Sequence, residues 1–176
     1  MKNIQEIFSI LKEKLGDFVL ELTSSQPFEP FITISPLKIN EVCLFLRDNE
    51  DLKFDSLVCL SGVDDANGKT IKDENGDNKI EGGTLSVYYH LESTKFRHKV
   101  VLKVSAAREN PEVSSVALIW HHADWHEREA YDLVGINFLN HPDLRRILMP
   151  YDWEAGHPLR KDYKNPEFYQ GMKVPY

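Results

Sequence analysis

Two adjacent segments with an alternating pattern place the strongest constraint on the fold of this 176-residue chain. In residues 84–91, TLSVYYHL, every second residue is large and apolar, and residues 98–105, HKVVLKVS, continue the alternation with Val100, Leu102 and Val104. A period of two is typical of a strand with one buried face. The two segments are therefore predicted to pair as strands of an antiparallel sheet.

Three earlier apolar segments are expected to add strands to this sheet. Residues 18–22 and 31–34 are short runs of large apolar and β-branched residues, separated by a proline-containing connection. Residues 54–63 end in LVCLSGV, which is too apolar for a strand with one face in water. We therefore expect this strand at the centre of the sheet.

Two helices are predicted in the first half of the chain. In residues 3–15 apolar residues recur at helical spacing, and Gly16 follows as a natural stop. Ser35 is expected to cap a second helix that has Pro36 at its first position. The apolar stripe of this second helix consists of Leu37, Ile39, Val42, Cys43, Phe45 and Leu46.

A further short helix is expected from a cap at Ser114 or Ser115 to Trp120. Helices combined with a mostly antiparallel sheet predict an α+β fold, a two-layer sandwich whose helices cover one face of the sheet. We place this single domain in residues 1–148 and interpret the polar segment at about 64–83 as a hairpin loop inserted into it.

Residues 149–176 differ in character from the rest of the chain. They combine four prolines with six aromatic residues and show neither a helical nor a strand period. Ordering such a segment on its own has a high entropy cost. We therefore expect an extended C-terminal tail that wraps a partner surface with its aromatic residues as anchors. A disordered tail is the alternative.

The segment from Trp120 to Arg146, WHHADWHEREAYDLVGINFLNHPDLRR, concentrates ionisable residues around one short helix. Asp124 is the expected N-cap, and Glu127 is expected to complete a capping box with it. Gly135 is the expected left-handed residue at the C-terminal end. These signals predict a helix of about three turns.

The charges of this helix and of the loop after it allow two interpretations. One is a salt-bridged surface helix, in which each exposed ion pair is worth about 0–1 kcal/mol. The other is a docking face, in which carboxylates hold guanidinium groups in place for a partner protein. The carboxylates are those of Glu127, Glu129 and Asp132, and the guanidinium groups are those of Arg128, Arg145 or Arg146. Residues 141–146 and 157–161 are similar, which predicts two turns that present basic groups to the same acidic partner.

The motifs of several enzyme classes are incomplete or absent in the sequence. His126-Glu127 begins like the HExxH motif of zinc proteases, but the second ligand position is Ala130. No nucleotide-binding glycine motif and no nucleophile motif of the GxSxG type is present. His121, His122 and His126 could meet at a metal, so a free-standing hydrolase or metal enzyme is kept as an alternative function.

The remaining composition narrows the class of protein. Cys43 and Cys59 lie in apolar settings without CxxC spacing, so we expect buried, reduced thiols and no iron-sulfur cluster. The net charge of −7 argues against binding to nucleic acid or to an anionic membrane surface. No apolar run approaches the ~20 residues of a membrane span, and the first residues do not resemble a signal peptide. We expect a cytosolic location.

A series of motifs with fixed spacing continues from the helix into the tail. They are Glu127-Arg128-Glu129, Asp132, Gly135-Ile136, Phe138, the run His141-Pro142-Asp143-Leu144-Arg145-Arg146-Ile147-Leu148, and the run His157-Pro158-Leu159-Arg160-Lys161-Asp162-Tyr163. This pattern resembles the C-type or 30 kDa-type subunit of the NADH-quinone oxidoreductase of respiratory complex I. The resemblance is strong over about residues 114–163 and elsewhere lies mostly in the order of the elements.

The resemblance implies a subunit without cofactor or catalytic residues of its own, in the peripheral arm of a proton-pumping complex. It implies docking to the D-type subunit, which lines the quinone cavity, with flavin and iron-sulfur clusters in partner subunits. It also implies attachment to the cytoplasmic side of the cell membrane through those partners. The same module serves related hydrogenase-type and plastid complexes. The implied structural and interface residues are Glu127, Arg128, Glu129, Asp132, His141, Arg145, Arg146, His157 and Arg160.

Overall fold

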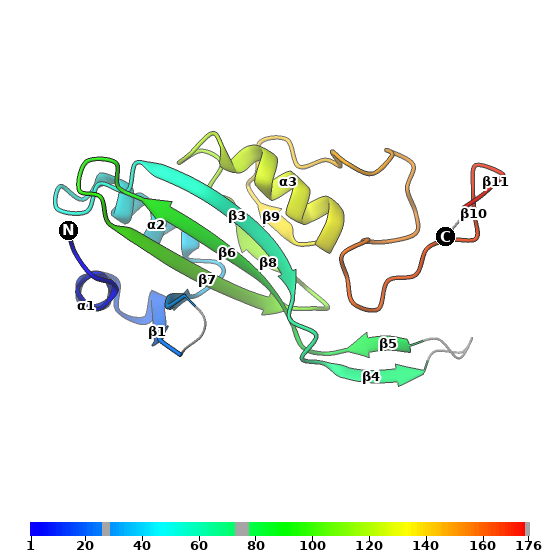
Figure 1. The fold of residues 1–176 in the computed structure, drawn as a ribbon, viewed down its shortest axis with the longest axis horizontal. Coiled ribbons are helices and arrows are strands. Elements are labelled where there is room, and N and C mark those ends of the chain that lie inside the picture. Colours follow the sequence, from blue (N-terminus) through cyan, green and yellow to red (C-terminus); the bar gives the residue numbers. More distant parts are fainter. Residues whose placement is uncertain (26–28, 73–77, 175–176) are drawn as a thin grey trace.

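The centre of the molecule is a five-stranded sheet with the strand order β1-β2-β7-β6-β3 (Figure 1). The structure is a computed structural model that describes residues 1–25, 29–72 and 78–174. The strands of the sheet are β1 (Val19–Thr23), β2 (Phe31–Ile34), β3 (Ser56–Asp64), β6 (Thr84–Glu92) and β7 (Lys99–Ala107). Neighbouring strands are antiparallel except β2 and β7, which run parallel. The sheet is therefore mixed but mostly antiparallel.

The two segments with the alternating pattern form β6 and β7. They pair antiparallel, with Val87 opposite Val104. Leu85, Val87, Tyr89 and Leu91 are each at most 1% exposed. Burying a side chain of this size contributes about 1.5–3 kcal/mol, so this face supplies much of the core. The predicted strand pair is confirmed.

Three helices cover one face of the sheet and confirm the two-layer α+β fold. They are α1 (Ile4–Leu15), α2 (Ile39–Asp48) and α3 (Ala123–Val134). Ile7 of α1, Val42 of α2 and Ala130 of α3 belong to the same core cluster as Tyr89 of β6. In Figure 1, α2 lies behind β6 and β7, and α3 lies along β3.

The start predicted for the second helix was wrong. α2 begins at Ile39 rather than after Ser35, because residues 36–38 form a turn. In this turn the Lys38 N–H donates to the Ser35 carbonyl oxygen at 3.0 Å. Ser35 and Pro36 therefore begin a turn, which has the same local sequence preferences as a helix start.

The short helix predicted before Trp120 was also wrong, because this segment makes only one turn. The N–H groups of Ile119 and Trp120 both donate to the carbonyl oxygen of Val116, at 2.9 and 3.1 Å. The N–H of Val116 itself donates to the carboxylate of Glu127 at 2.7 Å. A long-range side chain thus binds the backbone at this turn.

The strand predicted at the centre of the sheet, residues 54–63, is β3, which lies at the edge. Its apolar residues have two different environments: Leu60 is 3% exposed, whereas Val58 is 51% exposed. A Cβ added to Gly62 would lie 2.9 Å from the Cβ of Ala130, so α3 approaches the strand closely at this glycine. The apolar content of β3 therefore reflects its cover by α3 and not a central position.

Within the described residues, three two-stranded sheets lie outside the main sheet. β4 (Lys69–Lys72) pairs antiparallel with β5 (Asn78–Glu81), β8 (Glu112–Ser114) pairs parallel with β9 (Asn137–Leu139), and β10 (Phe168–Tyr169) pairs antiparallel with β11 (Met172–Lys173). The β4–β5 hairpin occupies part of the segment predicted as an inserted loop at 64–83, and it projects from the end of the sheet (Figure 1). Residues 73–77 of that segment lie outside the described residues.

The chain after β9 passes over α3 and then continues away from the sheet (Figure 1). Residues 140–167, all of which are described, contain no helix or strand. This matches the extended form expected for the tail. The domain boundary at 148/149 and the wrapping of a partner stay predictions.

Candidate functional site

Helix α3 carries four of the nine candidate residues, and only one of its two predicted caps is present. Gly135 ends the helix in the left-handed region, with φ 81° and ψ 33°, and its N–H donates to the carbonyl oxygens of Ala130 and Tyr131. The predicted N-cap was wrong. The residue before the helix is His122, whose side chain makes no capping hydrogen bond, and Asp124 lies inside the first turn.

The predicted capping box was wrong as well, because Glu127 points into the protein. Its carboxylate accepts hydrogen bonds from the Ser115 hydroxyl at 2.6 Å and from the Val116 N–H at 2.7 Å. The residue is 0% exposed. Burial, together with the negative charge of Asp124, raises the pKa of Glu127 to about 7, although the hydrogen bonds from Ser115 and Val116 act in the other direction. Glu127 therefore joins α3 to the segment before it, and no contact with an arginine is found for it within the described residues.

Asp132 is also 0% exposed, but its carboxylate accepts from more donors than that of Glu127, and one of these donors is charged. Its Oδ1 accepts from the Arg146 guanidinium at 2.7 Å. Its Oδ2 accepts from the backbone N–H groups of Ile147, Leu148 and Met149 at 3.0, 2.8 and 2.8 Å. Burial would raise the pKa of Asp132, but these donors outweigh it and lower the pKa. Asp132 thus fixes the chain where the tail begins.

Within the described residues, Arg128 and Arg145 do not form the predicted ion pairs with Glu127, Glu129 or Asp132. The Arg128 Nε donates to the carbonyl oxygen of Arg145 at 3.3 Å, and its guanidinium lies 5.2 Å from the centre of the Trp125 ring. The side chain of Arg145 is 70% exposed, and its Nε donates to Asp143 at 2.9 Å. Glu129 is exposed. Arg128 is therefore part of this domain, whereas Arg145 extends into solvent.

The first histidine-proline turn, residues 141–146, lies against the N-terminal half of α3. The side chain of His141 is 0% exposed. Its Nδ1 accepts from the Asp143 N–H at 3.0 Å, so its Nε2 carries the hydrogen. That nitrogen lies 3.3 Å from the carbonyl oxygen of Asp124 and 3.8 Å from the carboxylate of Glu127. His141 therefore fills a position inside the protein.

The second such turn, residues 157–161, closes the opposite end of the helix. The last carbonyl oxygens of a helix have no partner within it. Here three donors of the turn bind three successive carbonyl oxygens of α3. The pairs are His157 Nδ1 with Asp132 at 3.0 Å, Leu159 N–H with Leu133 at 2.9 Å, and Arg160 Nε with Val134 at 2.8 Å. Burial lowers the pKa of both His157 and Arg160.

A buried ion cluster that the sequence analysis missed joins the sheet to the tail. The Arg108 guanidinium lies 2.7 Å from Asp64 and 2.5 Å from Asp162, and Arg108 is 6% exposed. Asp64 also accepts from the Lys161 N–H at 2.9 Å, and Asp162 accepts from the Ile80 N–H at 3.0 Å. Burial would raise the pKa of Asp64, but Arg108 and the N–H donors lower it. No local pattern signals this cluster, because Arg108 and Asp162 are 54 residues apart.

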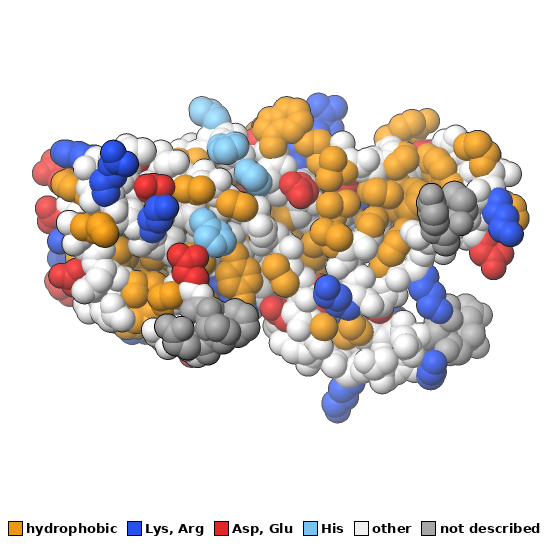
Figure 2. Space-filling view, viewed as in Figure 1, with side chains coloured by type: hydrophobic (Ala, Val, Ile, Leu, Met, Phe, Trp, Pro, Cys, Tyr) orange, Lys and Arg blue, Asp and Glu red, His pale blue; other side chains and the backbone are white. Residues whose placement is uncertain are grey.

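The surface beside α3 exposes large apolar side chains next to polar ones. Trp125 is 61% exposed and Leu148 is 60% exposed. A groove of about 400 Å³ lies between α3 and the chain that follows Arg146. It is lined by His122, Trp125, His126, Glu129, Ile147 and Leu148. Figure 2 shows histidine and hydrophobic side chains together on this face of the molecule.

The histidine pair on α3 and the two cysteines are the possible metal-binding or reactive groups considered in the sequence. His122 and His126 have ring centres 4.9 Å apart, but no group of three or more possible ligands is arranged around a metal position within these residues. Both cysteines are free thiols: Cys43 is buried, as expected, and Cys59 is only half-buried. None of the described helices is long and apolar enough to cross a membrane.

Known proteins resemble this chain in sequence and in fold. Residues 32–169 match the family described as respiratory-chain NADH dehydrogenase, 30 Kd subunit. The C-type subunit of the NADH-quinone oxidoreductase of Chloroherpeton thalassium is 44% identical over 171 residues, which cover 96% of this chain and 64% of the relative. The protein of the same name from Chlorobium phaeobacteroides is 41% identical over 177 residues, covering 100% of this chain and 98% of the relative.

A solved structure, the trypsin-resistant fragment of Nqo5, has the same fold with a TM-score of 0.58. The match covers 78% of this chain and 98% of the fragment at 22% sequence identity. At this identity the likeness concerns the fold alone.

Proposed function

Because this chain belongs to the family of the 30 kDa subunit of respiratory-chain NADH dehydrogenase, we propose that it is a cofactor-free subunit in the peripheral arm of a proton-pumping NADH-quinone oxidoreductase. In this function the chain supplies no catalytic residue. It supports electron transfer from NADH to quinone by docking to the subunit that lines the quinone cavity. Flavin and iron-sulfur clusters reside in other subunits, and those partners hold the chain at the cytoplasmic side of the membrane.

The observation that carries the docking proposal is the division of charged groups between the inside and the outside of the α3 region. Glu127 and Asp132 are fully buried and bind this chain's own groups, so neither carboxylate is accessible to a ligand from solution. Trp125 and Leu148, which line the groove, and Arg145, in the loop before Leu148, are each at least 60% exposed. Arginine and tryptophan are enriched in the energetically dominant parts of protein interfaces.

The buried groups have a second role in this proposal, which is to hold the exposed ones in place. Asp132 fixes the backbone of residues 147–149, and the Arg128 guanidinium fixes the carbonyl of Arg145. A surface that is ordered before binding loses less conformational entropy on binding. The α3 region therefore suits a permanent contact with a partner subunit.

Charge reversal at Arg145 tests the docking proposal. In Arg145→Glu the isolated protein should melt close to the wild type, because the side chain is 70% exposed. Co-purification with the quinone-cavity subunit from solubilised membranes should fall, and quinone-linked NADH oxidation should fall with it. Arg97→Glu is the matched control, since Arg97 is also exposed but lies in the turn between β6 and β7. Wild-type assembly in the Arg145 variant would contradict docking through this loop.

Metal and flavin analysis of the purified chain tests the cofactor-free part of the proposal. We expect no stoichiometric zinc, iron or flavin after gel filtration. One equivalent of bound metal that is lost in a His122→Ala, His126→Ala double variant would favour the metal-enzyme alternative instead.

A further inference from the structure

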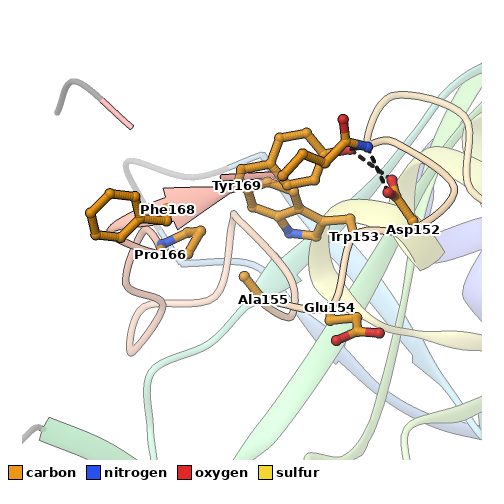
Figure 3. Close-up of a pocket in the computed structure, with 8 residues that line it drawn as sticks. Asp152, Trp153, Glu154, Ala155, Pro166, Phe168 and Tyr169 are labelled. Carbon is orange, nitrogen blue, oxygen red and sulfur yellow. Dashed lines mark hydrogen bonds between the residues drawn. The ribbon is translucent and has the colours of Figure 1, made fainter. Parts of the chain in front are cut away.

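The tail folds back on itself near its end. The carboxylate of Asp152 accepts from the hydroxyl of Tyr169 and from the side-chain amide of Gln170, both at 2.7 Å. The rings of Trp153 and Tyr169 lie 5.3 Å apart at an angle of 50°. The hydrogen bond to Asp152 raises the pKa of Tyr169 to about 12. These contacts join residues 152–153 to the β10–β11 hairpin, as Figure 3 shows.

A pocket of about 530 Å³ lies between the two joined segments. Aromatic rings, a proline and two carboxylates line it, and among the described residues no lysine or arginine does. The residues that matter here are Asp152, Trp153, Glu154, Pro166, Phe168 and Tyr169. Figure 3 shows the Trp153 and Tyr169 rings against each other, with Pro166 and Phe168 beyond them and Glu154 at the other end.

Two groups of this pocket lack a partner within the described residues. The Trp153 Nε1 is buried and has no hydrogen-bond acceptor. Glu154 is exposed, and no ion pair is found for it in the same part of the chain. Phe168 is 59% exposed at the rim. The pocket is therefore apolar in its walls and negative at its edge.

We propose that this pocket receives an arginine side chain from an extended, basic segment of a partner subunit. The guanidinium would stack on the Trp153 and Tyr169 rings and pair with the carboxylate of Glu154. This inference deepens the proposed docking function and rests on it for the identity of the partner.

The chemistry of the lining selects among possible occupants. An acidic side chain would be repelled by Asp152 and Glu154, and a purely apolar one would gain nothing from their negative charge. A cation over an aromatic face gains about 0.5–1 kcal/mol at an exposed site. Arginine is preferred over lysine because its planar group can stack on a ring and bind a carboxylate at the same time.

A peptide titration of the full-length chain tests the proposal. The probe is the blocked tripeptide acetyl-Gly-Arg-Gly-amide, and the readout is the NMR signal of the Trp153 indole N–H, assigned with a Trp153→Phe variant. We expect saturable shifts at millimolar concentration. The tripeptide with citrulline, which has the same shape without charge, should bind about three- to tenfold more weakly, as expected for the loss of one cation–π contact and one ion pair.

Variants and internal controls decide between the outcomes. Glu154→Gln should weaken the arginine peptide and leave the citrulline peptide unchanged, whereas Glu50→Gln, at an exposed site far from the tail, should change neither. The Trp120 and Trp125 signals should not move. A third peptide, acetyl-Gly-Leu-Gly-amide, serves as the apolar control. Equal binding of the arginine, citrulline and leucine peptides, or no shift of the Trp153 signal, would overturn the proposal. Because no partner subunit is present in this titration, a negative result would leave docking through Arg145 untouched.

Discussion

Glu127 and Asp132 lie on the same helix, are both fully buried, and yet have pKa values that shift in opposite directions. Glu127 accepts one hydroxyl and one backbone N–H. Asp132 accepts three backbone N–H groups and a guanidinium. Burial favours the neutral form of both carboxyls, so the number and charge of the donors decide which one stays ionised.

The difference separates two structural roles within one short motif. Asp132 acts as an anion around which the start of the tail is organised. Glu127, whose pKa is raised to about 7, changes its protonation near neutral pH and ties the helix to the segment before it. Each role makes its own prediction about stability and its pH dependence.

The largest effect is expected from Asp132→Ala. The change leaves the Arg146 guanidinium and three N–H groups without their acceptor, and breaking a buried ion pair costs about 3–5 kcal/mol. Chemical denaturation of the isolated chain would measure this loss. Asp143→Ala removes an exposed carboxylate from the same loop and should change stability by no more than about 0.5 kcal/mol. Equal losses of stability in Asp132→Ala and Asp143→Ala would contradict the role of Asp132 as the anion that holds the start of the tail.

Glu127→Gln should produce the next largest effect, and its size should depend on pH. The folded protein holds the Glu127 proton up to about pH 7, whereas the unfolded chain releases it near the usual value of 4.5. The folded state therefore binds more protons in this window, and the wild type loses stability as pH rises through it. Glutamine mimics the protonated form and should be more stable than the wild type by up to about 3 kcal/mol above pH 7.

The measurement is the difference in unfolding free energy between wild type and Glu127→Gln from pH 4 to pH 8. The difference removes the contributions of titrating groups that lie away from position 127. A difference that stays constant across this range would mean that Glu127 is ionised throughout. The contribution of Asp132 has the opposite sign, because its lowered pKa makes the protein lose stability only as pH falls below the ordinary range of aspartate.

A smaller loss is expected from Arg146→Ala. Hydrogen bonds to charged groups contribute about 1.5–3 kcal/mol, and Asp132 would keep its three N–H donors. Thermal unfolding of the isolated chain would detect the change. A double-mutant cycle with Asp132→Asn isolates the pairwise contribution, and a coupling energy near zero would show that the backbone donors alone hold Asp132.

The smallest change in stability is expected from Arg145→Ala, at most about 0.5 kcal/mol, because this neighbour of Arg146 is 70% exposed. Its effect should appear in assembly with partner subunits. Comparing the unfolding free energies of Arg145→Ala and Arg146→Ala therefore tests whether Arg146 stabilises the fold while its exposed neighbour does not. A clear loss of stability in Arg145→Ala would assign the residue to the fold of this domain.

Local patterns in the sequence determined the fold class and the positions along the chain of the five strands of the main sheet. The period of two in residues 84–91 predicted the strand β6, and the glycines at 16 and 135 predicted where α1 and α3 end. These signals act within a few residues and carry their own physical cause, which is a buried face or a left-handed backbone. The motifs of residues 127–163 also predicted the family to which the chain belongs.

Only the tertiary structure decided which groups meet. Glu127 has a good capping-box spacing from Asp124, but the buried Ser115 hydroxyl and Val116 N–H bind it instead. The edge position of β3 depends on which strand pairs with β6, and the Arg108–Asp162 contact spans 54 residues. A buried polar group takes the donor that the fold brings to it, because leaving it unpaired costs more than a local cap contributes. The partners of buried charges therefore depend on packing between distant segments, which no short pattern records.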